Sequence, residues 1–343
     1  MKPPDHPTPS GDREIARLFL RALETGGHAA RTVSTLRTFD NAGDRALQAD
    51  LMARAGEEAD WLVESLAPSP PDVWLTYHCY YKAPDLVGPP VTAALGIPYV
   101  IAEPSISPRR RAGPWAGFAA ASEAAIAHAD RLLWATMRDR PALEEAGFGA
   151  KLRSLPPFLD PGDAIQPRPA GRPLRLLTIA MMRPGDKIDS YRRIAAALGH
   201  LSDWELTVIG GGEGESAVQA LFEPHRPHVA FLGTLTDPRA VRAHAERADV
   251  FVWPGVGEGV GMVWLEAQAA GLPVVAEEGP AARALIGAGR LTPPGDAPAF
   301  ARAIGEVAAQ REQLSFRARA HVEAGHGLAA AARTLSSILE EVA

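Results

Sequence analysis

The sequence predicts an α/β protein with two domains, each built on a parallel sheet covered by helices. Apolar strand-like runs alternate with amphipathic helix-like runs along most of the chain, which is typical of parallel sheets. A proline-rich stretch at residues 155–173 interrupts this alternation, which then starts again. With 343 residues, 46% of them hydrophobic, the chain is long enough to bury two cores.

The first half of the chain begins with a loop, Pro-Ser-Gly-Asp-Arg at residues 9–13, that leads into a helix. Ser10 or Asp12 of this loop can cap the exposed amides of that helix. Short apolar runs predict strands, and longer runs with helical spacing predict helices. The expected strands are 31–36, 73–77, 98–102 and 132–135, and the expected helices are 12–25, 46–66, 115–128 and 138–146.

The second half repeats the pattern and ends in a helix. Its expected strands are 174–180, 205–209, 229–232, 249–253 and 273–276. The expected helices are 190–198, 216–222, 238–247, 262–270, 297–308 and 328–341.

The composition argues against several classes of protein. A formal net charge of −6 does not suit a dedicated nucleic-acid binder. Cys79 is the only cysteine, which excludes an internal disulfide and a cysteine zinc cluster and fits a reducing compartment. No apolar run approaches the roughly 18 residues of a membrane-spanning helix, and the first residues lack a signal-peptide core. We therefore expect a cytoplasmic protein with no nucleic-acid partner.

The most informative segment is 251–266, which reads FVWPGVGEGVGMVWLE. Glu258 falls in a strand-to-helix loop, and Glu266 follows about two helical turns later, near the same face. The amides of Gly259, Val260 and Gly261 lie where the helix begins, and unpaired amides at a helix N-terminus favour the binding of an anion. One carboxylate can therefore accept hydrogen bonds from sugar hydroxyls and the other can hold a ribose. The alternative is a solvated helix face behind an ordinary glycine-rich loop.

The continuation of this segment favours the nucleotide-sugar interpretation. Residues 258–304 resemble the donor-binding region of glycosyltransferase family 4, the group 1 glycosyl transferases of GT-B fold. The resemblance consists of two glutamates separated by seven residues, an Ala-x-Ala-x-Gly-x-Pro-Val-Val stretch and a Pro-Pro-Gly-Asp turn. The matching positions are Glu258, Glu266, Ala267, Ala269, Gly271, Pro273, Val274, Val275 and Pro294-Gly295-Asp296.

The resemblance implies a fold and a domain organisation. In the GT-B fold, two Rossmann-like domains face each other across a cleft. Residues 1–160 would form the acceptor-side domain and residues 161–326 the domain that binds the nucleotide sugar. Residues 327–343 would form a helix that crosses back to the first domain.

The resemblance also implies a reaction. Such enzymes move a sugar from a nucleotide diphosphate sugar to an acceptor, with retention of configuration and without a metal. Arg183 and Lys187 would stabilise the leaving diphosphate, and Gly11 would approach the donor phosphates. The family's usual spacing between the two cations is one residue longer, so the spacing leaves open which of the two roles each cation has. The sequence holds no Cys-x-x-Cys or clear Asp-x-Asp motif, and we expect neither a metal nor a cofactor.

A glycine turn follows the strand at 205–209. Residues 210–217, GGGEGESA, contain Gly-x-Gly-x-x-Ala, which by itself favours a dinucleotide-binding enzyme. The next expected strand, however, ends in Gly233-Thr234 and offers no acid for an adenosine ribose. The resemblance assigns Gly210 and Gly211 to the donor site instead.

The acceptor side is less clearly specified. His78 lies in a polar aromatic run after a strand and could orient or deprotonate a hydroxyl, or simply be a buried, satisfied histidine. Many family members place a histidine after the strand that matches 99–102, but here Glu103 stands in that region as a candidate substitute. The acceptor itself, whether a glycan, a lipid-linked molecule or a small molecule, is not specified.

Three arginines precede two aromatic residues in the first half. Arg109, Arg110 and Arg111, near Trp115 and Phe118, could touch an anionic lipid surface or an anionic acceptor, or form a plain loop at the rim.

The family's first strand is absent from the chain. Pro3 and Pro4 stand where that strand would end, and proline supplies no ladder donor. We expect the natural protein to begin about ten or more residues upstream. The missing strand and histidine leave alternatives open: a degenerate GT-B protein acting as a binding or scaffold subunit, or another enzyme of this fold such as a sugar-nucleotide epimerase or a phosphorylase.

Overall fold

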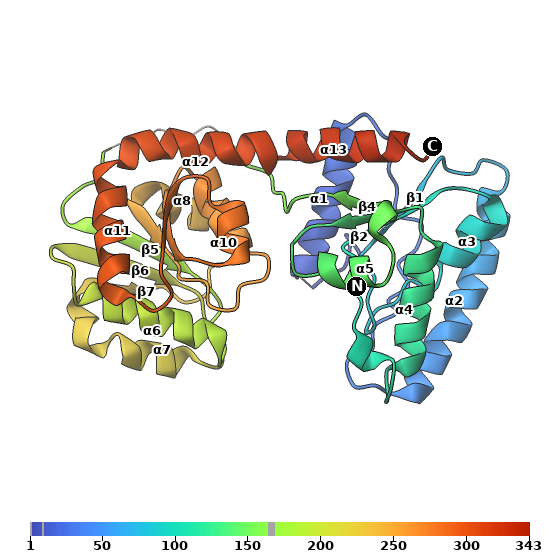
Figure 1. Cartoon of the computed structure of the whole chain (residues 1–343), viewed down its shortest axis with the longest axis horizontal. Coiled ribbons are helices and arrows are strands. Elements are labelled where there is room, and N and C mark those ends of the chain that lie inside the picture. The colour runs from blue at the N-terminus through green and yellow to red at the C-terminus, as the bar shows by residue number, and fades with distance from the viewer. Residues whose placement is uncertain (1, 9, 164–168) are drawn as a thin grey trace. The chain divides into compact units, whose positions relative to one another are not determined.

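The computed structural model describes residues 2–8, 10–163 and 169–343. The chain forms two compact units (Figure 1). Unit 1 comprises residues 1–157 and 328–343, and unit 2 comprises residues 158–327. The sequence placed the corresponding boundaries after residues 160 and 326.

Unit 1 contains a four-stranded parallel sheet with the order β1-β2-β3-β4. Its core is formed by apolar side chains of the sheet and of the covering helices, including Leu62, Ile101, Ile126 and Leu132. Its elements in chain order are α1 (Gly11–Thr25), α2 (Arg45–Leu66), β1 (Trp74–Tyr77), α3 (Gly88–Leu95), β2 (Tyr99–Ala102), the 3₁₀ helix η1 (Pro108–Arg110), α4 (Ala116–His128), β3 (Arg131–Trp134), α5 (Arg140–Glu145), η2 (Gly149–Lys151), β4 (Leu152–Ser154) and α13 (Leu328–Glu340).

Unit 2 contains a six-stranded parallel sheet with the order β10-β9-β8-β5-β6-β7. The central strands are almost wholly apolar and buried, as strands covered on both faces must be. Its elements are β5 (Leu174–Ile179), α6 (Asp186–Leu198), β6 (Trp204–Ile209), α7 (Glu215–Leu221), η3 (Glu223–His228), β7 (Val229–Phe231), α8 (Pro238–Arg247), β8 (Val250–Val252), α9 (Met262–Ala269), β9 (Val274–Glu277), α10 (Pro280–Leu285), β10 (Gly289–Thr292), α11 (Ala297–Ala309) and α12 (Arg311–Gly325).

The strand expected at residues 31–36 is wrong. These residues form no strand, and within the described ranges β1 is the first strand of the chain and an edge of its sheet. The run has the apolar composition of a strand, but backbone donors and acceptors make a ladder only with a neighbouring strand. The sequence also missed α3, α10 and the strands β4 and β10, which are short or flanked by glycine and proline, and the longer helix α12.

The C-terminal helix α13 packs on α1 within unit 1 (Figure 1). Nε2 of His28 lies 2.8 Å from Oγ of Ser336 on α13. Just after the last residue of the helix, Glu341 accepts hydrogen bonds from Arg131 on β3 and Arg153 on β4, at 3.0 and 2.8 Å. None of the helices in the described residues has the length and apolarity needed to cross a membrane.

Candidate functional site

The sheet of unit 2 reverses its strand order between β5 and β8. Successive connections lead from β5 through β6 to β7 on one side, and from β8 through β9 to β10 on the other. At such a point the loops at the carboxyl ends of the two central strands diverge, and ligands of doubly wound proteins bind in the crevice there. The loop after β5 carries Arg183, the first turn of α6 carries Lys187, and the loop after β8 carries Glu258.

Lys187 and Glu258 meet at this switch point. The ammonium nitrogen of Lys187 lies 2.6 Å from Oε2 of Glu258, and the indole Nε1 of Trp253 donates to the same oxygen at 3.2 Å. The ammonium also lies 5.2 Å from the centre of the Trp253 ring. The two side chains are 26% and 16% exposed, so the pair is partly shielded yet open to a ligand. The ammonium keeps donors free for a phosphate oxygen, because it has three.

Glycines shape the loop that carries Glu258. Gly255, Gly257 and Gly261 have φ values of 77°, 64° and 70°, a region that side-chain-bearing residues rarely adopt. A Cβ on Gly255 would lie 2.2 Å from the ring of Trp264, which is itself buried. The amide of Val256 donates to Oγ of Ser190 on α6 at 3.0 Å, which ties the loop to the helix that begins beside Lys187.

The amides predicted to face the donor are free. Among the described residues, the amides of Gly259, Val260 and Gly261 donate to no protein acceptor. They lie at the N-terminus of α9, where unpaired donors and the helix dipole favour a negatively charged group. This arrangement can bind a phosphate or the oxygens of a sugar.

Arg183 and Glu266 complete the predicted donor residues. Arg183 is exposed and makes no ion pair or hydrogen bond to another described residue. Glu266 lies on α9 and is exposed, but its surroundings desolvate the carboxylate enough to raise its pKa above the ordinary value. An exposed carboxylate without a protein cation is available to accept hydroxyl hydrogen bonds.

The glycine turn after β6 packs against the loop after β5. A Cβ on Gly210 would lie 1.9 Å from the carbonyl oxygen of Ala180, so only glycine fits there. The amide of Met182 donates to the carbonyl of Gly211 at 2.9 Å. These glycines therefore have a packing role in joining the two loops, and contact of Gly210 and Gly211 with a donor stays a prediction.

Sequence reasoning missed a buried carboxylate beside this site. Glu277, at the end of β9, is 6% exposed and forms an ion pair with Arg193 on α6. Its Oε1 also accepts the amide of Gly295, in the Pro-Pro-Gly-Asp turn, at 2.8 Å. Glu277 thus connects α6, the helix that carries Lys187, with the loop after β10. A glutamate at the end of an otherwise apolar strand was the available signal.

Unit 1 brings the two predicted acceptor-side residues together. Nδ1 of His78 lies 3.5 Å from Oε2 of Glu103, although the two follow different strands, β1 and β2. The carboxyl ends of these parallel strands are adjacent, which explains the contact. Tyr77 lies next to them, and burial, then the charges of Glu103 and Asp12, raise the pKa of its hydroxyl.

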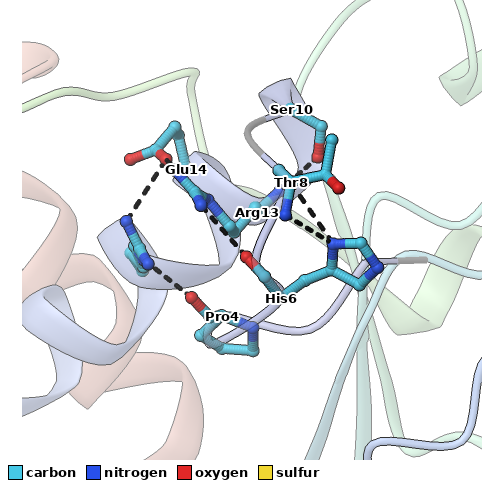
Figure 2. Close-up of polar contacts among 7 residues, drawn as sticks. Pro4, His6, Thr8, Ser10, Arg13 and Glu14 are labelled. Carbon is cyan, nitrogen blue, oxygen red and sulfur yellow. Dashed lines mark hydrogen bonds and ion pairs between the residues drawn. The ribbon is translucent and has the colours of Figure 1, made fainter.

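The loop before α1 is held by arginines of that helix (Figure 2). Oγ of Ser10 accepts the amide of Arg13 at 3.3 Å and caps the helix. The guanidinium of Arg13 donates to the carbonyl of His6 at 3.0 Å, and that of Arg17 to the carbonyl of Pro4 at 2.7 Å. A Cβ on Gly11 would meet nothing within 4 Å, so the fold gives this glycine no packing role. Its predicted approach to the donor phosphates stays a prediction.

The three consecutive arginines differ in their surroundings. Arg110 stacks over Tyr81 and Trp115, with its guanidinium carbon 5.1 and 4.7 Å from the ring centres. Arg111 forms an ion pair with Glu123 at 2.9 Å, and Arg109 is exposed. Phe118 is fully buried on the core side of α4, so this residue is not part of a basic aromatic surface.

No group of three or more His, Cys, Asp or Glu side chains in the described residues could hold a metal ion. Independence of a metal and of a cofactor stays a prediction.

Comparison with known proteins identifies the second unit. Residues 174–310 match the family model described as "Glycosyl transferases group 1". Unit 2 is a group 1 glycosyl transferase domain. The predicted resemblance to group 1 enzymes is thereby confirmed, whereas the narrower assignment to family 4 stays a prediction.

Curated relatives of the group 1 domain are glycosyltransferases. The chain is 40% identical over 110 residues to the phosphatidyl-myo-inositol mannosyltransferase of Mycobacterium leprae, covering 30% of this chain and 28% of that protein. It is 29% identical over 221 residues to the amylovoran biosynthesis glycosyltransferase AmsK of Erwinia amylovora, covering 60% and 50%. The matched part thus spans half or less of the length of these relatives.

Solved structures extend the likeness to both units. Anabaena Alr3699/HepE in complex with UDP has a TM-score of 0.68 at 16% identity and covers 97% of each chain. The lipopolysaccharide outer core galactosyltransferase WaaB has a TM-score of 0.63 at 18% identity, covering 89% of this chain and 83% of the other. At these identities the likeness shows the fold, which is GT-B, with the group 1 domain as its second Rossmann-like half.

Proposed function

We propose that the protein is a glycosyltransferase that moves a sugar from a nucleotide diphosphate sugar to an acceptor hydroxyl, with retention and without a metal or cofactor. The observation that carries this proposal is the pair of Lys187 and Glu258 at the strand-order switch point of a group 1 domain. A cation for a diphosphate and a carboxylate for sugar hydroxyls stand side by side there, beside free amides. The UDP complex of HepE supports a nucleotide of this class as the ligand.

In the proposed reaction, the bond between the sugar C1 and the diphosphate oxygen breaks while the acceptor oxygen bonds to C1 on the same face. The acceptor hydroxyl proton passes to the departing phosphate oxygen, so no protein nucleophile is needed. Lys187 and Arg183 stabilise the negative charge that develops on the diphosphate, as preorganised cations do. Glu258 orients the donor sugar, and Glu266 holds the ribose.

Unit 1 supplies the acceptor side in this proposal. The pair of His78 and Glu103 offers a nitrogen and a carboxylate that can accept a hydroxyl hydrogen bond and orient the attacking oxygen. Orientation by such groups accounts for a large part of the rate in bimolecular transfers.

The first test is nucleotide binding followed by turnover. Thermal unfolding is measured with UDP, GDP, ADP and TDP, with NAD as control, since a ligand of the folded state raises the melting temperature. We expect a shift with one diphosphate that is lost in Lys187→Ala and weakened in Arg183→Ala. Arg192→Ala is the matched control, because Arg192 is an exposed arginine of α6 paired only with Asp189.

Turnover then separates the alternatives. Release of the diphosphate from the matching nucleotide sugar, stimulated by an acceptor and retained in EDTA, supports the proposal. Isomerisation of the donor without acceptor would indicate an epimerase, and phosphate-dependent cleavage of an oligosaccharide a phosphorylase. If the protein neither binds a nucleotide nor turns over a nucleotide sugar, the remaining interpretation is a binding or scaffold subunit.

A further inference from the structure

A row of aromatic rings continues from His78 along unit 1. The rings of His78 and Tyr80 are 4.8 Å apart between centres, those of Tyr80 and Tyr81 5.6 Å, and those of Tyr81 and Trp115 5.8 Å. Each pair meets edge to face. We call Tyr80, Tyr81 and Trp115 the aromatic row; all three are half-buried.

Cations gather at the Trp115 end of the aromatic row. The guanidinium of Arg110 lies over both Tyr81 and Trp115, and the ammonium of Lys82 lies 5.8 Å from the Trp115 ring centre. Lys82 donates to Oδ1 of Asn41 at 2.8 Å, a neutral partner that leaves its charge uncompensated. Stacking uses the faces of the guanidinium and leaves its in-plane N–H groups available.

The stacked arginines of unit 1 differ in their partners. Arg37 lies 4.7 Å from the centre of the Phe39 ring and, like Arg110, forms no ion pair among the described residues. Arg140 also stacks on an aromatic ring, with its guanidinium 5.1 Å from the centre of Trp134, but it forms an ion pair with Glu144 at 2.8 Å. In the described residues, Arg110 has no acidic partner. An arginine fixed by two rings and lacking a carboxylate is prepared for an external anion.

The opposite end of the row carries acidic groups. Glu103 pairs with His78, and burial, then the charges of Asp12 and Tyr81, raise the pKa of the Tyr80 hydroxyl, whereas the charge of Arg37 lowers it. The His78 side of the row thus has two carboxylates and one guanidinium, while Arg110 and Lys82 at the Trp115 end have no carboxylate partner among the described residues. A molecule with a hydroxyl at one end and an anionic group at the other matches the pair of His78 and Glu103 and these two cations.

We propose that the acceptor is anionic, and that Arg110 and Lys82 bind its phosphate or carboxylate while its reacting hydroxyl lies at His78 and Glu103. That this ligand is the acceptor of a sugar transfer rests on the proposed function. The anion site itself stands on the geometry of unit 1 alone.

Calorimetric titration of the full chain with glucose 6-phosphate, glucuronate and glucose tests the site. The titrations use the Lys187→Ala variant, so that the donor site does not contribute anion binding. We expect saturable binding of one or both charged sugars and none of glucose. The charged sugar that binds distinguishes phosphate from carboxylate. Arg110→Gln is expected to weaken this binding about tenfold or more, because a charge-assisted forked contact is lost.

Arg140→Gln is the matched control and is expected to leave the affinity unchanged, because that guanidinium is already paired. Arg110→Lys and Lys82→Gln provide second variants if Arg110→Gln does not fold; the lysine variant keeps the charge but not the fork and should bind with intermediate affinity. Equal affinity in Arg110→Gln and the parent, or equal binding of glucose, overturns the proposal. Binding to phosphatidylglycerol vesicles without binding of a soluble charged sugar also overturns it, in favour of membrane contact by Arg109 and Arg110.

The two proposals fail separately. Binding of a charged sugar that depends on Arg110, without any nucleotide binding in the parent chain, would retain the anion site and remove the transferase. Nucleotide turnover with an acceptor KM that Arg110→Gln does not change would retain the transferase and remove the anionic acceptor.

Discussion

Lys187 and Glu258 are 71 residues apart in the chain and form an ion pair with a separation of 2.6 Å at the point where the strand order of unit 2 reverses. Trp253 contacts both partners, by a hydrogen bond to the carboxylate and by its ring under the ammonium. Two groups of opposite charge thus hold each other in place, each with capacity left for a ligand. Preorganisation of this kind lowers the cost of ordering a site when the ligand arrives.

Removing either partner should damage catalysis far more than stability. We expect Lys187→Ala and Glu258→Ala each to slow transfer by about 100-fold or more, since the proposed function has each group act on the donor. The partly exposed pair contributes about 1 kcal/mol or less to folding. Initial rates and urea unfolding measure the two effects. The double variant should be about as slow as either single one, because the residues act as a unit; full activity in either single variant would mean that the donor site lies elsewhere.

Gly255→Ala should destabilise the protein. The residue has φ of 77°, and the new Cβ would lie 2.2 Å from the ring of Trp264, whose Nε1 is fixed by a hydrogen bond to the carbonyl of Trp253. Strain and overpacking together predict a loss of about 2 kcal/mol or more. Gly56→Ala is the control, because its Cβ would meet nothing within 4 Å in α2, and it should gain about 0.5–1 kcal/mol. Urea unfolding that ranks the two variants in the opposite order contradicts the loop geometry.

Glu266→Gln should be more stable than the parent at neutral pH. Desolvation raises the folded-state pKa of Glu266 above its unfolded value. The group therefore destabilises the fold as pH rises through the folded pKa, and costs nothing below the unfolded pKa. The advantage of glutamine should appear at pH 7 and vanish near pH 4, with Glu312→Gln, an exposed glutamate of α12, as control. A stability difference that is the same at both pH values would remove this explanation. Nucleotide binding should weaken in the same variant if Glu266 holds the ribose.

His78→Gln and Glu103→Gln should impair transfer while leaving the donor site intact. Both residues lie in unit 1 and are in contact at 3.5 Å, and in the proposed reaction they orient one acceptor hydroxyl. We expect transfer to fall by about 10²-fold or more, the usual range for a positioned acid–base group. Nucleotide binding, measured by thermal shift, should be unchanged. A loss of nucleotide binding together with transfer would place the pair in the donor site.

Glu341→Gln should weaken the attachment of α13 to unit 1 at neutral pH. Hydrogen bonds from Arg153 and then from Arg131 hold the pKa of Glu341 below its ordinary value. This contribution is fully present above the unfolded pKa and is lost as pH falls through the folded pKa. The parent should therefore melt at a higher temperature than the variant at pH 7, with the difference shrinking below pH 4 and in high salt, because the group is exposed. The neighbouring Glu340→Gln, with no ion pair among the described residues, should show neither effect.

The sequence predicted most strands and helices of both units because local periodicity specifies them. Residues 238–247 and 328–340 show this: their helices begin and end within a residue of the expected bounds. The prediction failed at residues 31–36, where a strand-like composition has no partner strand. It also failed at β4 and β10, because these short polar sequences form strands only beside a neighbouring strand. The position of Phe118 in the chain, near three arginines, does not reveal that this residue lies on the buried face of α4.

The sequence by itself predicted which residues would carry the chemistry: the glutamates of the Glu-x₇-Glu segment, the two cations after β5, His78 and Glu103. These assignments follow from residue type, local spacing and resemblance. Only the tertiary structure decided that Lys187 contacts Glu258, that His78 contacts Glu103, that Arg193 pairs with the unsuspected Glu277, and that Arg110 lacks an acidic partner. Each of the three contacts joins segments that are far apart in the chain, and the surroundings of Arg110 depend on which side chains the fold brings near it. Strand order and helix packing set these neighbours, because parallel strands adjacent in a sheet are separated in sequence by whole helices.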